Sequence, residues 1–488
     1  MAQRNFPKEI NTKSQFSITS KDRRFILVII DFVALNSGFL LSLAYRPDYK
    51  LNWKLVIDHP VWFLLLTGLW FFWGYLFQIF DLEKANRFTT AFFPILSVGF
   101  LTLGTFILVP YLAPMLPPSR SPLFITLLAP VGGLLAGRAV YLLVFGRAVF
   151  RQKVLILGAG GAGRTICQAF LDHAQAIYEV VGFIDDDPEK FGREITFSHQ
   201  GRGELGDQKS SFLVLGSSDQ LLEIVPARGV TMIVLSITHN VSGELYQVLT
   251  DSLQQGVEVV PMPLLHEQIT GKVPVEHIGD HWSVAMPLEQ LGTRLIWHAG
   301  KRIFDIFWSS LGLLLLGLLF PFIALAIKLD SAGPILYTQK RMGQGGKQIR
   351  VFKFRSMIKD AEKDQAVWAK INDTRVTRVG RILRRTHIDE FPQFWTIFKG
   401  EMSVVGPRPE RPEFINELAE EIPFYRVRLA VKPGMAGWAL IHQGYGASKD
   451  DALIKLQYDL YYIKHQSFWL DVYILWRTFI DAVTFRGR

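Results

Sequence analysis

The chain has 488 residues, a formal net charge of +9 and a mean hydropathy of +0.21. This length exceeds what one hydrophobic core usually supports, which argues against a small single-domain protein. The high hydropathy, together with 12 Trp and 37 Phe, indicates a membrane component. The single cysteine, Cys167, excludes an intrachain disulfide and fits a reducing compartment.

Residues 1–150 contain four apolar stretches, each close to the roughly 20 residues that cross a bilayer as a helix. They occupy residues 25–45, 61–80, 88–112 and 122–145. Basic residues from Arg4 to Arg24 precede the first stretch and predict a cytoplasmic N-terminus. That stretch is long and lacks a small-residue cleavage site, so we do not expect a cleavable signal peptide. Arg138, inside the fourth stretch, is expected to snorkel or to face a neighbouring helix.

Residues 151–262 alternate short apolar strands with helical segments. Strands are predicted at residues 153–157, 179–184, 212–215, 232–237 and 257–260. This order indicates a parallel sheet with flanking helices, and therefore a Rossmann-like domain of the nucleotide-binding type.

A glycine-rich turn follows the first predicted strand. Gly158, Gly160 and Gly163 have the spacing G-x-G-x-x-G, which lets a backbone approach a pyrophosphate at a helix N-terminus. Asp185 ends the second strand, where an acid that binds ribose is expected. Two interpretations stay open: the domain binds an unidentified nucleotide, or it keeps the tight turn and binds nothing catalytic.

Residues 263–300 have no clean period and are predicted to be a linker. The apolar run that follows, residues 303–327, is long enough to span a membrane. Pro321 must break or kink a helix there, and basic residues at both ends of the run favour a cytoplasmic location for both. A re-entrant helix-break-helix that dips into one leaflet satisfies both constraints.

Residues 301–488 hold the whole basic excess of the chain, which suits anionic lipids, phosphorylated substrates or nucleic acid. Within them, the motif KFRSM begins at Lys353 after a strand-like run. Arg378, Arg381 and Arg385 are spaced to share one face of a helix, which could lie along lipid headgroups.

Two adjacent carboxylates, Asp389 and Glu390, follow these arginines in HIDEFPQFW. A single charged cluster is most simply explained as a solvated face. Two carboxylates between arginines and an aromatic, membrane-adjacent helix are harder to explain in that way, so this pair is the candidate chemical centre.

Long motifs across residues 301–478 together resemble the bacterial sugar transferases, the monotopic phosphoglycosyl transferases. They are KRIFDIFW, KLDSAGPILYTQKRMG, FKFRSM, RVTRVGRILRRTHIDEFPQFW, KGEMSVVGPRPERPEF, YRVRLAVKPGMAGW and KLQYDLYYIKHQSFWLD. The preceding half is similar to the larger members of that family. The resemblance implies a membrane protein with four N-terminal transmembrane helices, an α/β Rossmann-like middle domain, and a mixed α/β catalytic domain with a re-entrant helix.

The resemblance also implies a reaction. A hexose-1-phosphate would pass from a UDP-sugar to undecaprenyl phosphate through a covalent aspartyl-phosphosugar, with release of UMP. Asp389 matches the aspartate nucleophile, and Glu390 matches the acidic partner that holds Mg²⁺; a nearby helix N-terminus would keep Asp389 ionised. Pro321 matches the proline of the re-entrant helix. The residues that match the binding site for pyrophosphate or UMP are Lys353, Arg355, Arg384 and Arg408.

Such enzymes begin exopolysaccharide, capsule or O-antigen synthesis at the cytoplasmic face of the bacterial inner membrane. The implied partners are the two substrates, inner-membrane lipids, downstream glycosyltransferases and a second copy of the chain, with no nucleic acid. Phe320 departs from the family, where many members have Ser, and so does His387, which replaces a common Ser and for which we expect a packing role. The sequence leaves the sugar open.

Two other functions remain open at this point. A membrane-bound, NAD-dependent sugar-nucleotide dehydratase or epimerase would use the glycine turn. Such an enzyme needs a catalytic Tyr–Lys pair in the same domain as the glycine turn. The Y-x-x-x-K match, from Tyr445 to Lys449, lies far beyond that domain, which argues against a dehydratase or epimerase. A non-enzymatic scaffold would use the basic C-terminal half to hold partners on anionic membranes.

Overall fold

The computed structural model describes residues 19–50, 53–86, 88–117, 119–147, 150–200, 207–237, 243–277, 295–358, 374–443 and 448–484. They form two compact units, Met1–Leu265 and His266–Arg488. The predicted division into segments 1–150, 151–262, 263–300 and 301–488 is finer than this and stays a prediction. The basic residues before Thr19, as well as Tyr445, lie outside the described residues.

Each of the four predicted membrane segments coincides with a helix of the first unit. By length and composition, three of these helices could cross a membrane, and the second is a shorter apolar helix of 17 residues. They are α1 (Ser20–Ala44), α3 (Pro60–Leu76), α5 (Phe88–Ile107) and α6 (Arg120–Phe145), with the short helices α2 (Trp53–Asp58) and α4 (Leu82–Ala85) between them.

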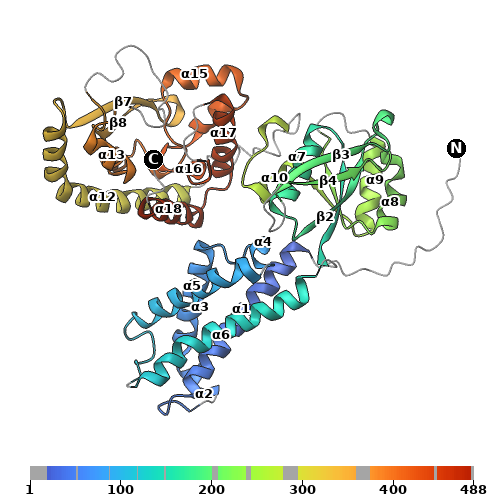
Figure 1. The fold of residues 1–488 in the computed structure, drawn as a ribbon, viewed down its shortest axis with the longest axis horizontal. Coiled ribbons are helices and arrows are strands. Elements are labelled where there is room, and N and C mark those ends of the chain that lie inside the picture. Colours follow the sequence, from blue (N-terminus) through green and yellow to red (C-terminus); the bar gives the residue numbers. More distant parts are fainter. Residues whose placement is uncertain are drawn as a thin grey trace. The chain divides into compact units, whose positions relative to one another are not determined.

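The helices α1 and α6 lie side by side (Figure 1). Two glycines allow their backbones to approach closely. A Cβ on Gly133 would lie 2.5 Å from the carbonyl oxygen of Ala34, and one on Gly38 would lie 2.6 Å from that of Ala129. Small residues at such crossings promote the tight packing that holds apolar helices together in lipid.

A buried ion pair joins the same two helices. Arg138 on α6 donates through Nε and Nη2 to the carboxylate of Asp31 on α1, at 2.9 and 2.6 Å. Its Nη1 donates to the carbonyl oxygen of Ile79 at 3.2 Å. Of the two expectations for Arg138, the one in which it faces a neighbouring helix is therefore confirmed.

A parallel sheet of four strands follows, in the order β2-β1-β5-β6. Its core contains buried apolar side chains of β1 and β5, with Leu245 and Leu249 packing on them from a helix. The strands are β1 (Gln152–Leu157), β2 (Tyr178–Ile184), β5 (Met232–Leu235) and β6 (Glu258–Pro261), and the helices are α7 (Gly161–His173), α8 (Leu221–Arg228) and α9 (Gly243–Gln254).

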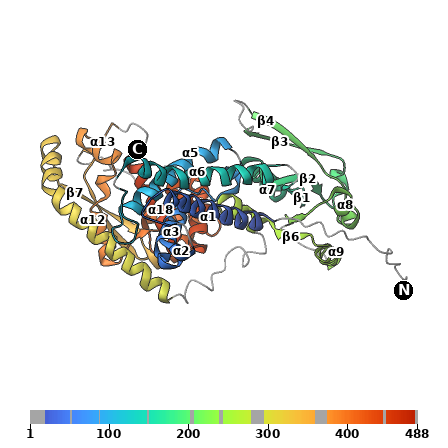
Figure 2. The same cartoon turned by 90° about the horizontal axis from the view of Figure 1, so that it is seen from below.

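A polar hairpin, β3 (Glu194–Gln200) and β4 (Asp207–Leu213), extends from this sheet (Figure 2). The sequence predicted a strand at residues 212–215 instead. In the structure Phe212 and Leu213 are the last residues of β4, and Val214 forms only an isolated parallel bridge to Phe183. The two strands carry few apolar residues, and Phe197 anchors them by packing near Phe183 and Phe212. Such long-range contacts leave no period in the sequence.

The second unit mixes helices with two small sheets, as predicted for the catalytic domain. The antiparallel pair is β7 (Leu336–Met342) with β8 (Gln348–Phe354), and the parallel pair is β9 (Ser403–Val405) with β10 (Gly434–Ala436). The helices are α12 (Leu295–Asp330), α13 (Arg378–Arg385), α14 (Gln393–Lys399), α15 (Pro412–Glu421), α16 (Trp438–Gln443), α17 (Lys449–Lys464) and α18 (Phe468–Val483).

Part of the predicted linker is an ordered helix, α10 (Met262–Thr270). Buried Glu267 on α10 accepts hydrogen bonds from Lys464 at 2.8 Å and from the His465 ring at 2.9 Å. The Trp438 indole donates to the carbonyl oxygen of Gly271 at 2.9 Å. These contacts fix the end of α10 to the second unit, although the local sequence shows no periodicity.

The helix α12 is longer than predicted and continues through Pro321. Figures 1 and 2 show it as one bent helix rather than two separate ones, and an interior proline removes a backbone hydrogen bond and bends a helix. Phe320 packs near Phe354 of β8, which gives this departure from the family a packing role.

The helix α12 has one buried stripe and one apolar face left uncovered. The stripe recurs every three or four residues and includes Asp305, Ser309, Gly312 and Ile327. A Cβ on Gly312 would lie 2.4 Å from the ring of Phe394, so α12 packs closely on α14. The exposed large apolar residues of the other face include Ile303, Phe307, Leu314, Leu318, Phe322, Leu325 and Leu329.

Candidate active site

The two carboxylates lie in a 3₁₀ turn, Ile388–Glu390, between α13 and α14. His387 turns the chain into it with a left-handed backbone, φ 56°, which few non-glycine residues adopt. Thr377 caps the start of α13 by accepting a hydrogen bond from the Gly380 amide at 3.0 Å. Asp389 and Glu390 are both buried.

Glu390 is held by two cations from different elements. Lys353 of β8 donates through Nζ to Oε1 at 2.8 Å, and Arg408, after β9, donates through Nη2 to Oε1 at 2.5 Å and through Nη1 to Oε2 at 3.4 Å. Burial raises the pKa of Glu390, but Arg408 and Lys353 outweigh it and hold the pKa well below its usual range. Glu390 is therefore ionised at neutral pH.

Asp389 differs from its neighbour in having no such anchor. Among the described residues, none donates a hydrogen bond to its carboxylate, whereas Glu390 accepts three. Burial, and then the charge of Glu390, raise the pKa of Asp389 to about 6, although Lys353, Arg384 and Arg408 act in the opposite direction. At pH 7 this group is still mostly ionised, and its oxygens accept no hydrogen bond from the described residues.

Two neighbours of the pair come from the α13 end. Arg384 acts electrostatically on Asp389, so the structure brings this predicted residue to the site. Burial lowers the pKa of His387 despite the opposing effect of Glu390, so the ring is neutral near pH 7. His387 thus combines a left-handed backbone position with a ring that is electrostatically coupled to Glu390, and its expected packing role stays a prediction.

Arg355 is placed differently from the other predicted cations. Its Nη2 donates to the carbonyl oxygen of Ser331 at 2.6 Å and to the Ser331 hydroxyl at 2.9 Å. It also approaches the carbonyl oxygen of Ile327 at 3.4 Å. Ser331 directly follows α12, and the carbonyl oxygen of Ile327 also accepts the Ser331 amide at 3.2 Å, so Arg355 adds hydrogen bonds at this end of the helix. The structure therefore shows Arg355 capping a helix, and its predicted contact with substrate stays a prediction.

The glycine turn belongs to the first unit. Gly158 has φ 108°, and a Cβ on Gly163 would lie 1.9 Å from the Gly158 carbonyl oxygen, so both positions require glycine. A Cβ on Gly160 would meet no atom within 4 Å. The turn therefore has the tight geometry that the spacing predicted.

Asp185 is already engaged at the end of β2. Its Oδ2 accepts the amide of Ala159 at 2.8 Å, and Lys190 donates to both of its oxygens at 3.1 and 3.2 Å. Burial raises the pKa of Asp185, but these hydrogen bonds, with that of the Asp187 amide, lower it overall. Lys190 is a partner that the sequence did not reveal.

Known proteins resemble the chain over both units. The sequence model of the family described as bacterial sugar transferase matches residues 296–485. A UDP-N-acetylgalactosamine-undecaprenyl-phosphate N-acetylgalactosaminephosphotransferase of Aeromonas hydrophila is 39% identical over 248 residues, which cover 50% of this chain and 57% of the relative. A UDP-glucose:undecaprenyl-phosphate glucose-1-phosphate transferase of Escherichia coli (strain K12) is 33% identical over 342 residues, which cover 67% of each protein.

The chain belongs to the bacterial sugar transferase family. An undecaprenyl-phosphate glucose phosphotransferase of Komagataeibacter xylinus is also similar, 35% identical over 342 residues that cover 67% of this chain and 58% of the relative. The chain thus spans just under three fifths of the length of the Aeromonas and Komagataeibacter relatives.

The features that would serve a dehydratase belong to different units of this family member. Lys449 belongs to the second unit, where it forms an exposed ion pair with Glu421 at 2.6 Å. The glycine turn belongs to the first unit. The contacts of Lys449 therefore give no support to a Tyr–Lys pair beside the turn.

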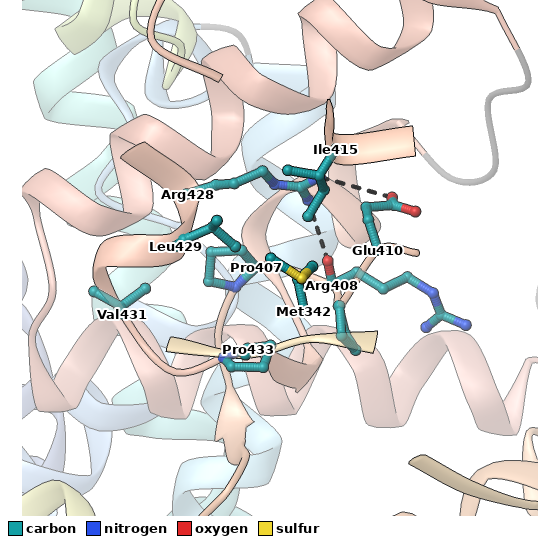
Figure 3. Close-up of a pocket in the computed structure, with 11 residues that line it drawn as sticks. Met342, Pro407, Arg408, Glu410, Ile415, Arg428, Leu429, Val431 and Pro433 are labelled. Atoms are coloured by element: carbon teal, nitrogen blue, oxygen red, sulfur yellow. Dashed lines mark hydrogen bonds and ion pairs between the residues drawn. The ribbon is translucent and has the colours of Figure 1, made fainter. Parts of the chain in front are cut away.

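Sequence reasoning missed a buried polar cluster close to Arg408. It surrounds a small pocket lined by residues that include Met342, Pro407, Glu410 and Arg428 (Figure 3). The motif YRVRLAVKPGMAGW contains Arg428 and was part of the resemblance, but a lone arginine in a motif does not reveal which atoms it contacts.

Proposed function

We propose that the chain is a phosphoglycosyl transferase that moves a hexose-1-phosphate from a UDP-sugar to undecaprenyl phosphate. The observation that carries this proposal is the buried pair Asp389–Glu390, in which Glu390 is tied to Lys353 and Arg408 while Asp389 is free to react. The three relatives, each named as an undecaprenyl-phosphate sugar phosphotransferase, support the same reaction.

The reaction would proceed in two displacements. In the first, a carboxylate oxygen of Asp389 attacks the sugar-bearing phosphorus; the bond from that phosphorus to the bridging oxygen breaks, and UMP leaves with the electron pair. In the second, a phosphate oxygen of undecaprenyl phosphate attacks the same phosphorus and frees the Asp389 carboxylate. A covalent intermediate lets a water-soluble donor and a lipid acceptor use one site in turn.

The cations of the site suit this chemistry. Lys353 and Arg408 donate hydrogen bonds to the carboxylate of Glu390, and the charge of Arg384 lowers the pKa of Asp389. Positive charge held in place before reaction stabilises the negative charge that develops on transferred and leaving phosphates. The same groups offset part of the cost of bringing a dianionic phosphate next to two carboxylates.

Glu390 is also suited to hold Mg²⁺. In proteins this ion is commonly held by one or two carboxylates together with the phosphates of the substrate. Glu390 would supply a carboxylate, and bound Mg²⁺ would neutralise charge on the phosphates. Because Lys353 and Arg408 already contact Glu390, they would share its oxygens with the ion.

We further propose that α12 is re-entrant, with both ends at the cytoplasmic face of the inner membrane. Near its start, Arg302 donates to the carbonyl oxygen of Phe398 at 2.6 Å, and Asp305 accepts from Ser403 at 2.8 Å. At its other end, Asp330 accepts the amide of Val379 at 2.9 Å. These contacts support the proposal because they tie both ends to one compact unit, and a simple crossing would separate the ends.

Labelling tests the orientation of α12. Cys167 is buried and its thiol pKa is raised by burial, so the parent chain should react little with maleimides. Ala299→Cys and Lys347→Cys place exposed thiols before and after the apolar run. A membrane-impermeant maleimide should label neither in intact cells and both in inverted vesicles. Labelling of either from outside would overturn the re-entrant orientation.

For the middle domain we propose a Rossmann-like fold that binds a nucleotide at the glycine turn. The parallel order β2-β1-β5-β6 and the tight approach of Gly163 support it. A ribose at Asp185 would have to displace Lys190 or bind beside it. Isothermal titration of the purified protein with nucleotides tests this proposal, with Asp185→Asn as the variant that should weaken binding.

The wider role stays a proposal as well: this enzyme would begin exopolysaccharide, capsule or O-antigen synthesis. The proposed partners are inner-membrane lipids, a second copy of the chain and downstream glycosyltransferases. Pull-down from membranes with the tagged full chain would test the protein partners.

Release of UMP tests the central proposal directly. Purified protein with undecaprenyl phosphate and Mg²⁺ should release UMP from UDP-glucose, UDP-galactose or an N-acetylated UDP-hexose, and the panel would identify the sugar. Asp389→Asn should reduce release to background, while the exposed control Glu401→Gln should not. Without acceptor, a donor labelled in the sugar should mark the wild-type protein and leave Asp389→Asn unmarked. Full turnover by Asp389→Asn would end the proposed mechanism.

A further inference from the structure

The backbone that carries Arg408 is held at several consecutive points. Lys301 and Tyr462 both donate to the carbonyl oxygen of Val405 at 3.1 Å. The amide of Gly434 donates to the carbonyl oxygen of Pro407 at 2.8 Å, and the amide of Met342 donates to that of Glu410 at 2.9 Å. Arg408 lies in the middle of this segment, between Pro407 and Pro409.

The carbonyl oxygen of Arg408 itself is held by a side chain. Arg428 donates to it through Nη2 at 3.1 Å (Figure 3). In the same view the Arg408 side chain extends away from Arg428, and its guanidinium binds Glu390. Arg428 thus contacts the backbone of Arg408 and not its functional group.

Arg428 is itself fixed by three groups around it. It is 5% exposed, and it donates to Asp459 at 2.8 Å and to the hydroxyl of Tyr425 at 2.7 Å. Its Nη1 also lies 3.8 Å from Oε1 of Glu410. Two carboxylates near one buried guanidinium leave little net positive charge for an anion, which argues against Arg428 as a substrate contact.

The geometry around Arg408 makes such a hold effective. Prolines on both sides fix two φ angles, so little backbone freedom can absorb a shift of the Arg408 carbonyl. If the Arg408 carbonyl moves, the Arg408 side chain must therefore lose its contact with Glu390 or adopt a strained conformation to keep it. A displacement of about 1 Å in a catalytic group can reduce a rate by about a hundredfold.

We propose that Arg428 is a positioning residue: by holding the Arg408 carbonyl, it aims the Arg408 guanidinium at Glu390. This inference rests on the proposed sugar-phosphate transfer, since Arg408 is important there through its charge at the reacting phosphates. Asp459 and Tyr425 support Arg428 in turn, because they fix the direction of its planar fork.

The test is a double-mutant cycle on UMP release by the full-length protein, with undecaprenyl phosphate and Mg²⁺. Arg428→Lys keeps the positive charge beside Asp459 but cannot donate in three directions at fixed geometry. We expect it to lower kcat/KM by about tenfold to a hundredfold. In an Arg408→Lys background, Arg428→Lys should lower kcat/KM by less than about twofold, because the guanidinium that Arg428 positions is already missing.

A general structural defect would give a different pattern. If Arg428→Lys lowered kcat/KM by the same factor in both backgrounds, the proposal would be overturned. The matched control is Arg426→Lys, an exposed arginine two residues away, which should leave kcat/KM unchanged. Should Arg428→Lys fail to fold, Tyr425→Phe can replace it, because it removes one of the hydrogen bonds that orient Arg428. Tyr425→Phe should lower kcat/KM in the wild-type background and have little effect on kcat/KM in the Arg408→Lys background.

Failure of the proposed function is distinguishable from failure of this inference. If the wild-type protein released no UMP from any UDP-sugar, the reaction itself would be wrong. A structure of Arg428→Lys would then decide the positioning role without an activity measurement. An Arg408 guanidinium that leaves Glu390 would support it, and an unchanged contact at 2.5 Å would refute it.

Discussion

The guanidinium of Arg408 lies 2.5 Å from the carboxylate of Glu390, although the two residues are carried by separate elements of the second unit. Lys353 reaches the same oxygen from β8. Glu390 therefore joins three parts of the fold at one buried point. Asp389, beside it, keeps its oxygens free of hydrogen bonds from the described residues.

Replacing Glu390 by Gln should leave the site folded but poorly active. The amide cannot balance Lys353 and Arg408, and these cations would then move toward Asp389 or the substrate. We expect kcat to fall by about a hundredfold to a thousandfold, as when a group that organises transition-state charge is removed. UMP release measures it, and circular dichroism checks the fold. A loss of less than about threefold would contradict the role given to Glu390.

The pH dependence of kcat/KM should have an acid limb near the pKa of Asp389, about 6. Below this pH the carboxyl is protonated and cannot attack, so kcat/KM should fall about tenfold per pH unit. The pKa of Glu390 is lowered, so its protonation should not contribute in this range. The free energy of unfolding should change in the opposite direction with pH. Asp389 binds its proton more tightly in the folded state than in the unfolded state. Its contribution to the free energy of unfolding therefore decreases as the pH rises from about 4 to 6.

His387 provides the control for that assignment, because its ring also lies beside the pair. Burial lowers the pKa of His387, so this ring also titrates on the acid side of neutrality. In His387→Gln the acid limb should remain near pH 6. Its disappearance would assign the limb to the histidine instead of Asp389.

Asp31→Asn should destabilise the membrane helices, because it leaves Arg138 buried and without its counter-charge. Breaking one side of a buried ion pair typically costs about 3–5 kcal/mol. The double variant Asp31→Leu with Arg138→Met should recover much of that loss. Thermal unfolding in detergent would measure both. Equal destabilisation by the single and the double variant would show that charge pairing is not the cause.

Two alanine substitutions separate the structure of the glycine turn from its binding function. Gly163→Ala places a Cβ 1.9 Å from the Gly158 carbonyl oxygen and should destabilise the first unit by about 2 kcal/mol. Gly160→Ala meets no atom within 4 Å and should leave the melting temperature within about 2 °C. If Gly160→Ala lowers nucleotide affinity at unchanged stability, the turn binds a ligand. If affinity is unaffected, the turn is structural only.

Charge reversal on α13 distinguishes an enzyme from a scaffold. Arg378, Arg381 and Arg385 are exposed on one face, as their spacing predicted. Changing all three to Glu should weaken flotation with anionic vesicles, since each basic residue near such a surface contributes about 1 kcal/mol. UMP release in detergent should persist. The scaffold function would be favoured if the unmutated protein released no UMP and the triple variant no longer floated with the vesicles.

Much of this organisation was readable from the sequence. Apolar length predicted the helices α1, α3, α5 and α6, and strand patterns predicted β1, β2, β5 and β6, because both signals arise from neighbouring residues. The adjacent carboxylates Asp389 and Glu390 and the arginines of α13 were visible for the same reason. Shared motifs added Lys353, Arg384 and Arg408, which the structure brings to that pair.

Only the tertiary structure decided what depends on distant partners. The hairpin β3–β4, the helix α10 inside the predicted linker and the helical cap formed by Arg355 all rest on contacts between residues far apart in the chain. The hydrogen bond from Arg428 to the Arg408 carbonyl also joins distant residues. Lys190 lies only five residues after Asp185, but its hydrogen bonds to that carboxylate depend on how the turn between them folds. The difference in pKa between Asp389 and Glu390 has the same origin, since burial and charge around adjacent carboxylates are set by folding and not by their order in the sequence.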